Sequence, residues 1–461
     1  MLNRNEIALI DEKFAVEGKL EGETLVVVLF PNGTKSLLLS FDGGPQGLKA
    51  SRELARLIDP NCELKIVCAE KERRAAESLA QLAKGARSKI VTYARRCRWR
   101  FDHERGSLKV LPEDKIRVMI VDDSKTIRSL LEKIFSTDPD LEIVGNFGDP
   151  QEAVREIGKI KPDVMTLDIH MPGLTGLDVL RRIMPQNPVP TIMVSSVGIQ
   201  DGRDVLNALE LGAIDYVQKP SFEEISVLAP ILLEKVKVAA TIDVRSKRQV
   251  AKPAAPAKVP LAGLTYDRRK VIFIGSSTGG TEAIKRIFRS MPKQFPPVVI
   301  TQHIPKHFSL AFAESLGKQY GITVSEAVDG QEVRANEVLI APGGLQMEVV
   351  ADKAGGLRVR VFDGEPVNRH KPSVDVLFRS AAKVVGKHAV GIILTGMGAD
   401  GAEGLKRMRE SGAMTMAQDQ ATSVVYGMPR VATENGAAQK VLGIDEFAAA
   451  LLEECRMKSA A

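Results

Sequence analysis

Residues 271–281 constrain the fold of this chain more than any other segment. Four apolar, mostly β-branched residues run into a cluster of Gly, Ser and Thr, and apolar residues then recur at helical spacing. This pattern predicts a buried strand, a sharp turn and a helix. Residues 275–279 fit G-x-S-x-G, a turn that presents the Ser277 hydroxyl at the carboxyl end of a parallel sheet. The free N–H groups of a helix N-terminus favour developing negative charge there.

A glycine-rich turn of this kind can also cradle a phosphate, so the neighbouring strands decide between the two interpretations. The apolar run 297–302 ends at His303, where a dinucleotide-binding fold would place an acidic residue for the ribose. A third apolar run, 389–394, leads into a glycine-rich loop that contains Asp400. Ser277, His303 and Asp400 therefore follow three predicted strands, at the sheet edge where catalytic groups gather.

These three residues predict a Ser-His-Asp hydrolase, with Ser277 as the nucleophile, His303 as its base and Asp400 orienting the imidazole. Their chain order differs from the Ser-Asp-His order of α/β-hydrolases, so we expect another doubly wound fold. His307 is the rival base, but it lies beyond the predicted strand end. His370, in a polar loop, is interpreted as structural or substrate-facing.

From residue 115 onward a second pattern appears, in which five predicted strands alternate with helices. This alternation predicts a parallel sheet covered on both faces. Polar residues stand at the strand ends: Asp122, Asp123, Asp168, Ser195 and Lys219. Clustered carboxylates repel one another unless a hard cation such as Mg²⁺ neutralises them. A carboxylate beside Mg²⁺, a lysine and a hydroxyl can attack a phosphoryl donor.

Residues 115–238 resemble the receiver domain of bacterial two-component response regulators. The resemblance implies that Asp168 accepts the phosphoryl group and that a histidine kinase supplies it. It also implies a Mg²⁺ site formed by Asp122, Asp123, Asp168 and the backbone carbonyl of His170, with Ser195 and Tyr216 as the switch pair and Lys219 contacting the phosphoryl group.

The C-terminal motifs G-S-S-T-G-G-T, I-T-Q-H-I-P, V-N-R-H-K-P-S-V-D and L-T-G-M-G-A-D-G resemble the chemotaxis protein-glutamate methylesterase family, CheB. The resemblance covers residues 115–458. It implies hydrolysis of glutamyl methyl esters on methyl-accepting chemotaxis receptors, together with deamidation of particular glutamines. The backbone near Thr278 and Met397 would then face the oxyanion, and the esterase reaction would need no cofactor.

We therefore expect an α/β protein with a flavodoxin-like doubly wound receiver domain, a linker over 239–266 and a doubly wound parallel α/β esterase domain over 267–458. Residues 1–112 form an accessory region, expected to be α+β, whose role the sequence does not indicate. Its basic run Arg96, Arg98 and Arg100 could bind an anion, but a solvated strand face is the favoured interpretation. A Pro-, Ala- and Lys-rich composition predicts a semi-extended tether for the linker.

Net charge and cysteine content exclude few functional classes of protein. The net charge of +6 is mild for 461 residues and says little about partners. Cys62, Cys68, Cys97 and Cys455 show no metal-binding spacing, and we expect reduced thiols in a cytoplasmic protein. No leader, membrane span, helix-turn-helix or basic recognition helix is predicted. The remaining alternative is a catalytically idle esterase domain that serves as a phosphorylation-controlled adaptor.

Overall fold

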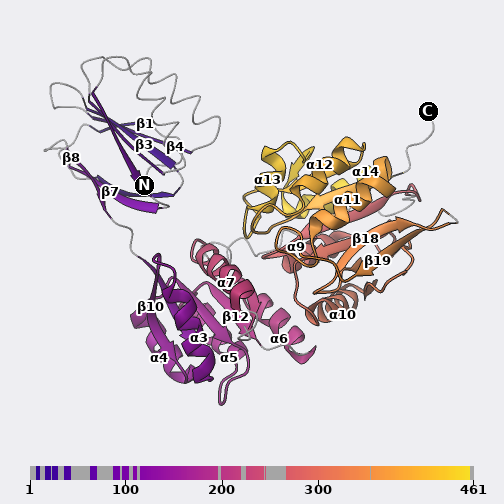
Figure 1. The fold of residues 1–461 in the computed structure, drawn as a ribbon, viewed down its shortest axis with the longest axis horizontal. Coiled ribbons are helices and arrows are strands. Elements are labelled where there is room, and N and C mark those ends of the chain that lie inside the picture. The colour runs from indigo at the N-terminus through magenta and orange to yellow at the C-terminus, as the bar shows by residue number, and fades with distance from the viewer. Residues whose placement is uncertain are drawn as a thin grey trace. The chain divides into compact units, whose positions relative to one another are not determined.

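The computed structural model describes residues 115–195, 199–219, 225–242, 244, 266–353 and 355–456, and the backbone of eight strands within 1–111. The chain divides into two compact units, Met1–Lys115 and Ile116–Ala461. Figure 1 traces the order of their elements along the chain. In the described parts of the chain, no helix combines the length and apolar character that crossing a bilayer requires.

The described strands of the N-terminal unit form two sheets. The larger has the order β1-β4-β3-β5-β6, in which only the β5–β6 pair is parallel, and the smaller has the antiparallel order β2-β7-β8. An Ala-, Glu- and Arg-rich pattern predicts a helix over roughly residues 70–82, and this segment lies outside the described residues. The strands are β1 (Ile7–Ile10), β2 (Val16–Glu21), β3 (Glu23–Leu29), β4 (Ser36–Asp42), β5 (Glu63–Ala69), β6 (Arg87–Tyr93), β7 (Arg96–Asp102) and β8 (Ser107–Leu111).

The basic run of β7 lies opposite charged residues of β2. The register pairs Arg96 with Glu21, Arg98 with Lys19 and Arg100 with Glu17. Two of the three arginines are therefore opposite acidic residues in the register and one is opposite a lysine. The choice between a solvated strand face and an anion-binding surface stays a prediction.

Residues 116–239 form a five-stranded parallel sheet of order β10-β9-β11-β12-β13, which is the flavodoxin-like order. Alternate residues of β9 point to opposite faces: Val118 and Ile120 pack with α3 and α7, and Met119 and Val121 pack with α4, α5 and α6. The strands are β9 (Ile116–Val121), β10 (Leu141–Phe147), β11 (Val164–Asp168), β12 (Thr191–Ser195) and β13 (Asp215–Gln218). The helices are α3 (Lys125–Ser136), α4 (Pro150–Ile160), α5 (Gly176–Gln186), α6 (Ile199–Glu210) and α7 (Ile225–Ala239).

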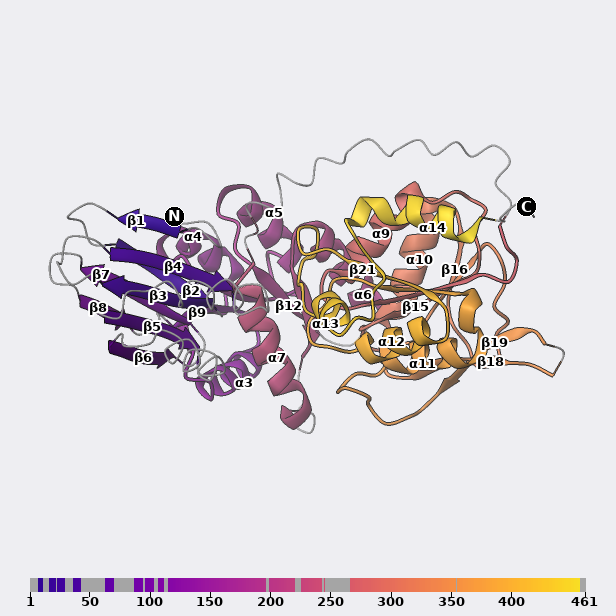
Figure 2. The ribbon, with the colours of Figure 1, turned by 90° about the horizontal axis from the view of Figure 1, so that it is seen from above.

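The C-terminal part forms a seven-stranded parallel sheet of order β16-β17-β15-β14-β20-β21-β22. Figure 2 shows α9, α10 and α14 on one side of this sheet and α11, α12 and α13 on the other. Its strands are β14 (Val271–Ser276), β15 (Val298–Gln302), β16 (Thr323–Glu326), β17 (Glu337–Ile340), β20 (Ala389–Ile393), β21 (Met414–Gln418) and β22 (Lys440–Leu442). An antiparallel hairpin lies beside them, β18 (Gln346–Ala351) and β19 (Leu357–Phe362).

Every residue of the central strand β14 is buried, because helices cover both of its faces. Ile272 and Ile274 pack with α9, α10 and α14, and Val271 and Phe273 pack with α11, α12 and α13. The helices are α9 (Gly280–Ser290), α10 (Phe308–Tyr320), α11 (Val374–Val384), α12 (Ala402–Glu410), α13 (Met428–Glu434) and α14 (Phe447–Cys455). The expected α/β class and both doubly wound sheets are confirmed.

Strand order brings the three predicted catalytic segments together. β14 lies between β15 and β20, and both neighbours are parallel to it. The residues that follow these three strands therefore meet at one edge of the sheet.

Of the four cysteines, Cys455 is the one whose side chain the structure describes. It is a buried free thiol on α14, and burial raises its pKa to about 12. A thiol held in its protonated form is a poor nucleophile and a poor metal ligand, so this cysteine serves packing.

Candidate active site

Ser277 stands on a tight turn between the end of β14 and the start of α9. Gly279 takes a positive φ of 77° as the N-cap of α9, which a side chain would disfavour. At Gly275 an added Cβ would lie 2.1 Å from the Cγ1 atom of Val374, so the backbone approaches α11 too closely for any other residue. The pattern of residues 275–279 reflects these two constraints, and the turn forms as the sequence predicts.

Gln302 ties the Ser277 turn to the His303 segment, a role that the sequence did not reveal. Its side chain is buried; Oε1 accepts a hydrogen bond from Ser276 Oγ at 2.6 Å. Its Nε2 donates to the backbone carbonyls of Ser277 at 2.9 Å and of His303 at 3.1 Å. One amide side chain thus fixes the spacing of the two strand ends.

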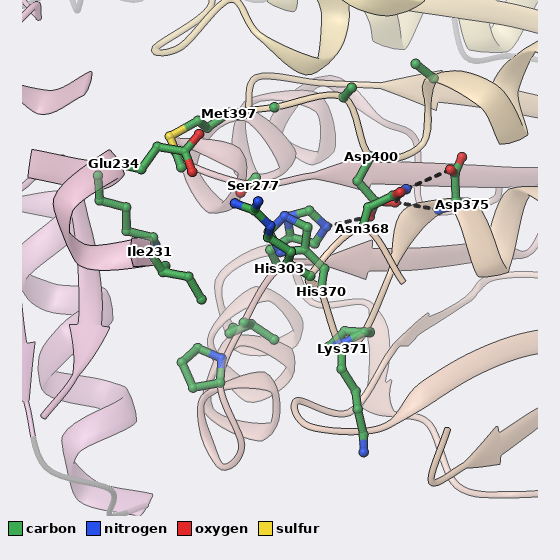
Figure 3. A pocket seen from close by; sticks show the side chains of 18 of the residues that line it. Ile231, Glu234, Ser277, His303, Asn368, His370, Lys371, Asp375, Met397 and Asp400 are labelled. Carbon is green, nitrogen blue, oxygen red and sulfur yellow. Dashed lines mark hydrogen bonds and ion pairs between the residues drawn. The ribbon is translucent and has the colours of Figure 1, made fainter. Parts of the chain in front are cut away.

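His303 contacts Asp400 directly. Its Nε2 lies 2.8 Å from Asp400 Oδ2, and both side chains are more than nine-tenths buried. Its Nδ1 atom is buried and has no hydrogen-bond partner. When Nε2 carries the proton that is donated to Asp400, Nδ1 is the atom with a free lone pair. Ser277, His303 and Asp400 line one cavity (Figure 3).

The Asp400 carboxylate accepts several further hydrogen bonds from residues 368–375. Oδ2 accepts from the backbone N–H of Val374 at 2.7 Å, and Oδ1 accepts from Ser373 Oγ and Asn368 Nδ2, both at 2.8 Å. Burial alone would raise the pKa of Asp400, but the hydrogen bonds from His303, Asn368 and Ser373 outweigh it and hold the pKa below its usual value. The carboxylate is therefore ionised and oriented.

A second buried carboxylate, Asp375, supports the first. Asn368 Nδ2 donates to Asp375 Oδ2 at 2.9 Å as well as to Asp400, and Asp375 Oδ1 accepts from the backbone N–H of Gly404 at 2.7 Å. The motif V-N-R-H-K-P-S-V-D carried the family resemblance, but no role was predicted for Asn368 or Asp375. The signal available was S-x-D at residues 373–375, a pattern typical of helix starts, where side chains bond free backbone N–H groups.

The two other histidines near the triad occupy different positions. His307 is the N-cap of α10 and is not among the residues that line the cavity. The histidine that contacts Asp400 is His303. The His370 ring stacks on the His303 ring, with centroids 3.6 Å apart and planes 11° apart. Burial, with the neighbouring His303 as a smaller cause, lowers the pKa of His370 to about 3. A neutral imidazole therefore covers one face of the candidate base.

The cavity has a volume of about 740 Å³ and is lined by both domains of the larger unit. Ile231 and Glu234 enter it from α7 (Figure 3). Of the two predicted oxyanion residues, Met397 lines the cavity, whereas the Thr278 hydroxyl contacts Oδ2 of Asp215, the first residue of β13. The contribution of their backbone N–H groups to an oxyanion site stays a prediction.

The predicted phosphorylation site also assembles. The carboxylate oxygens of Asp122, Asp123 and Asp168 lie within 4.8 Å of one another. Lys219 Nζ is 2.9 Å from Asp122 and 2.8 Å from Asp168. Burial raises the pKa of both buried carboxyls, and Lys219 opposes that effect. Three converging carboxylates in this setting fit a hard divalent cation.

The remaining receiver residues surround this site. Ser195 is buried at the end of β12, and its carbonyl accepts a hydrogen bond from the Lys219 N–H at 2.7 Å. Tyr216 is buried on β13, and its hydroxyl has no hydrogen-bond partner. The His170 side chain lies 3.9 Å from Asp204, and the role of its carbonyl as a metal ligand stays a prediction.

Contacts link the receiver sheet to the esterase sheet within the larger unit. The Tyr216 ring meets the Phe308 ring edge to face, with centroids 5.3 Å apart, at the start of α10. Lys285 of α9 pairs with Glu210 at 2.5 Å. The helices α6 and α10 approach so closely that a Cβ added to Gly202 would lie 3.1 Å from Ala311 Cβ. Strand β13 and helix α6 of the receiver part, and helices α9 and α10 of the esterase part, therefore take part in one interface.

Two family models match the chain: the response regulator receiver domain over residues 118–229 and CheB methylesterase over residues 272–451. A protein-glutamate methylesterase/protein-glutamine glutaminase of Syntrophotalea carbinolica is 45% identical over 346 residues, which are 74% of this chain and 97% of that protein. One from Caulobacter vibrioides is 46% identical over 342 residues, with 74% and 98% covered.

Among solved structures, the crystal structure of the Thermotoga maritima CheB methylesterase catalytic domain matches with 36% identity and a TM-score of 0.39, covering 40% of this chain and 97% of that one. The two family models and the identity to nearly full-length relatives settle the classification. The chain belongs to the CheB family of receiver-linked protein-glutamate methylesterases.

Proposed function

We propose that this chain hydrolyses methyl esters of glutamate side chains on methyl-accepting chemotaxis receptors, and deamidates particular glutamines, under the control of receiver phosphorylation. The proposed boundaries are a receiver domain over 115–238, a linker over 239–266 and an esterase domain over 267–458. The matched family ranges fall inside these boundaries.

The observation that carries the proposal is the environment of His303. One ring nitrogen is bonded to the ionised Asp400, and the other is buried without a partner in the cavity that Ser277 also lines. A neutral imidazole with one nitrogen held by a carboxylate and the other unengaged is suited to general-base catalysis.

The chemistry follows from this arrangement. His303 Nδ1 takes the proton of the Ser277 hydroxyl as Oγ attacks the ester carbonyl, and it returns that proton to the leaving oxygen, which departs as methanol. Water then attacks the acyl-serine bond with the same proton transfers and frees the glutamate carboxylate and Ser277. Asp400 stabilises the imidazolium in both steps, and the backbone near Thr278 and Met397 would bind the oxyanion.

Regulation rests on the acidic cluster of the receiver. Asp168 would accept a phosphoryl group from a histidine kinase, and Asp122, Asp123, Asp168 and the His170 carbonyl would hold Mg²⁺. The cation would neutralise the charge that accumulates on the phosphoryl oxygens. Lys219 already lies within 3 Å of Asp122 and Asp168 and is suited to contact the same oxygens.

The phosphorylated receiver would act on the esterase through the shared interface. In the present arrangement Tyr216 and α7 residues line the same cavity as Ser277, which would hinder entry of a receptor helix. Movement of Ser195 and Tyr216 on phosphorylation would loosen the Tyr216–Phe308 contact and open the cavity.

Methanol release from methylated receptor tests the proposal. Wild-type protein and Ser277→Ala are compared, each with and without a small-molecule phosphodonor. Release that requires Ser277 and rises with phosphodonor is the expected result. Absence of release from every cognate receptor array would leave the adaptor function, with Asp168 phosphorylation as the remaining chemistry.

A further inference from the structure

A tight turn beside the triad carries an arginine where the backbone disfavours one. Val367 and His370 form an isolated antiparallel bridge, with reciprocal N–H···O bonds of 3.0 and 2.9 Å. The two central residues both have positive φ, 53° at Asn368 and 67° at Arg369. Turns of this kind strongly favour Asn-Gly, because glycine tolerates the second position without strain.

Two of the four residues of this turn, Asn368 and His370, already have structural reasons to be there. Asn368 bonds the two carboxylates Asp400 and Asp375, and the His370 ring covers His303. Asparagine also tolerates positive φ. No structural reason of this kind applies to Arg369, because its side chain makes no hydrogen bond or ion pair with any described residue. A non-glycine residue held at positive φ beside an active site indicates a functional reason for the strain.

The charge environment of the cavity singles out the same residue. Four cationic side chains line it, and three have acidic partners: Lys235 pairs with Asp215, Lys371 with Asp363, and Arg379 with Asp375. Arg369 is the fourth, and it is exposed. Figure 3 shows its neighbours Asn368, His370 and Lys371 on the esterase wall of the cavity. Among the described cationic side chains that line the cavity, Arg369 is thus the one without an acidic partner, and it is available to bind an anion.

We propose that Arg369 determines specificity by binding a carboxylate of the substrate helix that lies one helical turn from the reacting glutamyl ester. A guanidinium binds a carboxylate with paired, charge-assisted hydrogen bonds. Side chains one turn apart on a helix lie side by side. When the glutamyl ester of a substrate helix enters toward Ser277, a carboxylate one turn away on that helix therefore reaches the cavity wall. This inference rests on the proposed function of the same site.

Two helical peptides provide the test, both with a central glutamyl methyl ester. One carries glutamate one turn before and one turn after the ester, and the other carries glutamine there. The ratio of kcat/KM for the acidic peptide to that for the neutral peptide is measured for wild type, Arg369→Gln and the matched control Lys371→Gln, all in the full chain with phosphodonor. Arg369→Gln should lower the ratio by roughly 10-fold, mainly through KM, whereas Lys371→Gln should keep it near that of wild type.

An equal fall in both variants would assign the effect to the general positive potential of the wall and overturn the proposal. A fall in kcat for both peptides without a change in their ratio would also overturn it, because Arg369 would then act on the triad. Arg369→Gly adds an independent readout. It should show the same loss of preference while relief of the positive-φ strain raises Tm by about 2–4 °C.

Failure of the proposed function is recognised separately. If wild type releases no methanol from either peptide, Ser277-dependent hydrolysis of a small neutral ester is measured with the peptides as inhibitors. The acidic peptide should inhibit wild type more strongly than it inhibits Arg369→Gln. Equal inhibition of the two proteins would overturn the assignment of Arg369.

Discussion

The Oδ2 atom of Asp400 accepts hydrogen bonds from both His303 Nε2, at 2.8 Å, and the backbone N–H of Val374, at 2.7 Å. The carboxylate that orients the candidate base is therefore also a partner for the first N–H of α11. Helix N-termini have N–H groups without internal partners and stabilise negative charge. Catalytic geometry and the start of α11 depend on one side chain.

Asp400→Asn should lose activity and stability together. The amide cannot accept all the bonds that the carboxylate accepts, and it leaves His303 without its charged partner. Ester hydrolysis should fall about 10³- to 10⁴-fold, and the free energy of unfolding should fall by about 1–3 kcal/mol. Urea denaturation and methanol release on the same preparation measure both. Ser373→Ala, which removes one donor to Asp400, is the control and should show smaller losses; undiminished hydrolysis by Asp400→Asn would contradict the assigned role.

The His370 ring should stay neutral at pH values where an ordinary histidine is protonated. Its pKa in the folded protein is about 3, against an ordinary value of 6.5. Below pH 6.5 the unfolded chain binds a proton that the folded chain does not, so His370 makes the protein less stable as pH falls from 6.5 toward 3. His370→Gln should therefore show a shallower decline in unfolding free energy between pH 7 and pH 5 than wild type.

An NMR titration of the histidine rings checks this directly. The resonance missing from His370→Gln identifies His370 among the six histidines, and it should not shift between pH 7 and pH 5. A midpoint near 6.5 for that resonance would show that the stacked ring is accessible to protons and would refute the prediction.

Removal of divalent cations should distinguish the phosphorylation of Asp168 from the ester hydrolysis at Ser277. A chelator should abolish phosphorylation of Asp168 by a small-molecule phosphodonor, because three clustered carboxylates need a cation before they admit a phosphoryl group. The Ser277-dependent hydrolysis of the unphosphorylated protein should be unaffected. Incorporation of a radiolabelled phosphoryl group measures phosphorylation, with Asp168→Asn as the control that should stay unlabelled, and methanol release measures hydrolysis. A chelator that also stopped hydrolysis by the unphosphorylated protein would point to a metal in the esterase site.

The receiver–esterase interface should restrain hydrolysis through pairs such as Arg203–Glu314, whose closest atoms are 2.8 Å apart. Both side chains are exposed, so reversing one charge should not impair folding. Arg203→Glu should raise hydrolysis by the unphosphorylated protein roughly two- to fivefold, as expected for a surface pair worth up to about 1 kcal/mol. The double reversal Arg203→Glu/Glu314→Arg should restore the wild-type rate. A rate that stays high in the double variant would show that the effect is not due to this pair.

Much of the candidate site could be predicted because parallel α/β sheets place functional groups at predictable points. An apolar run followed by a polar residue predicts both the strand and the edge at which its polar residue lies. This pattern predicts Ser277, His303 and Asp400 as one site and Asp122, Asp168 and Lys219 as another, and the residues of each set lie together in the structure. The supporting residues Gln302, Asn368 and Asp375 were not assigned roles, since each acts on segments that are remote in sequence.

By itself, the sequence determined the two doubly wound folds, the candidate nucleophile and the acidic cluster, because strand and helix periodicity is local and the polar residues follow the strands directly. Tertiary structure decided that β14 lies between β15 and β20, that Gln302 joins the Ser277 turn to the His303 segment, and that Arg369 stands in a strained turn at the cavity wall. These outcomes depend on which strands pair and on how α11 meets the sheet. Both are set by packing between distant segments, which local periodicity does not encode.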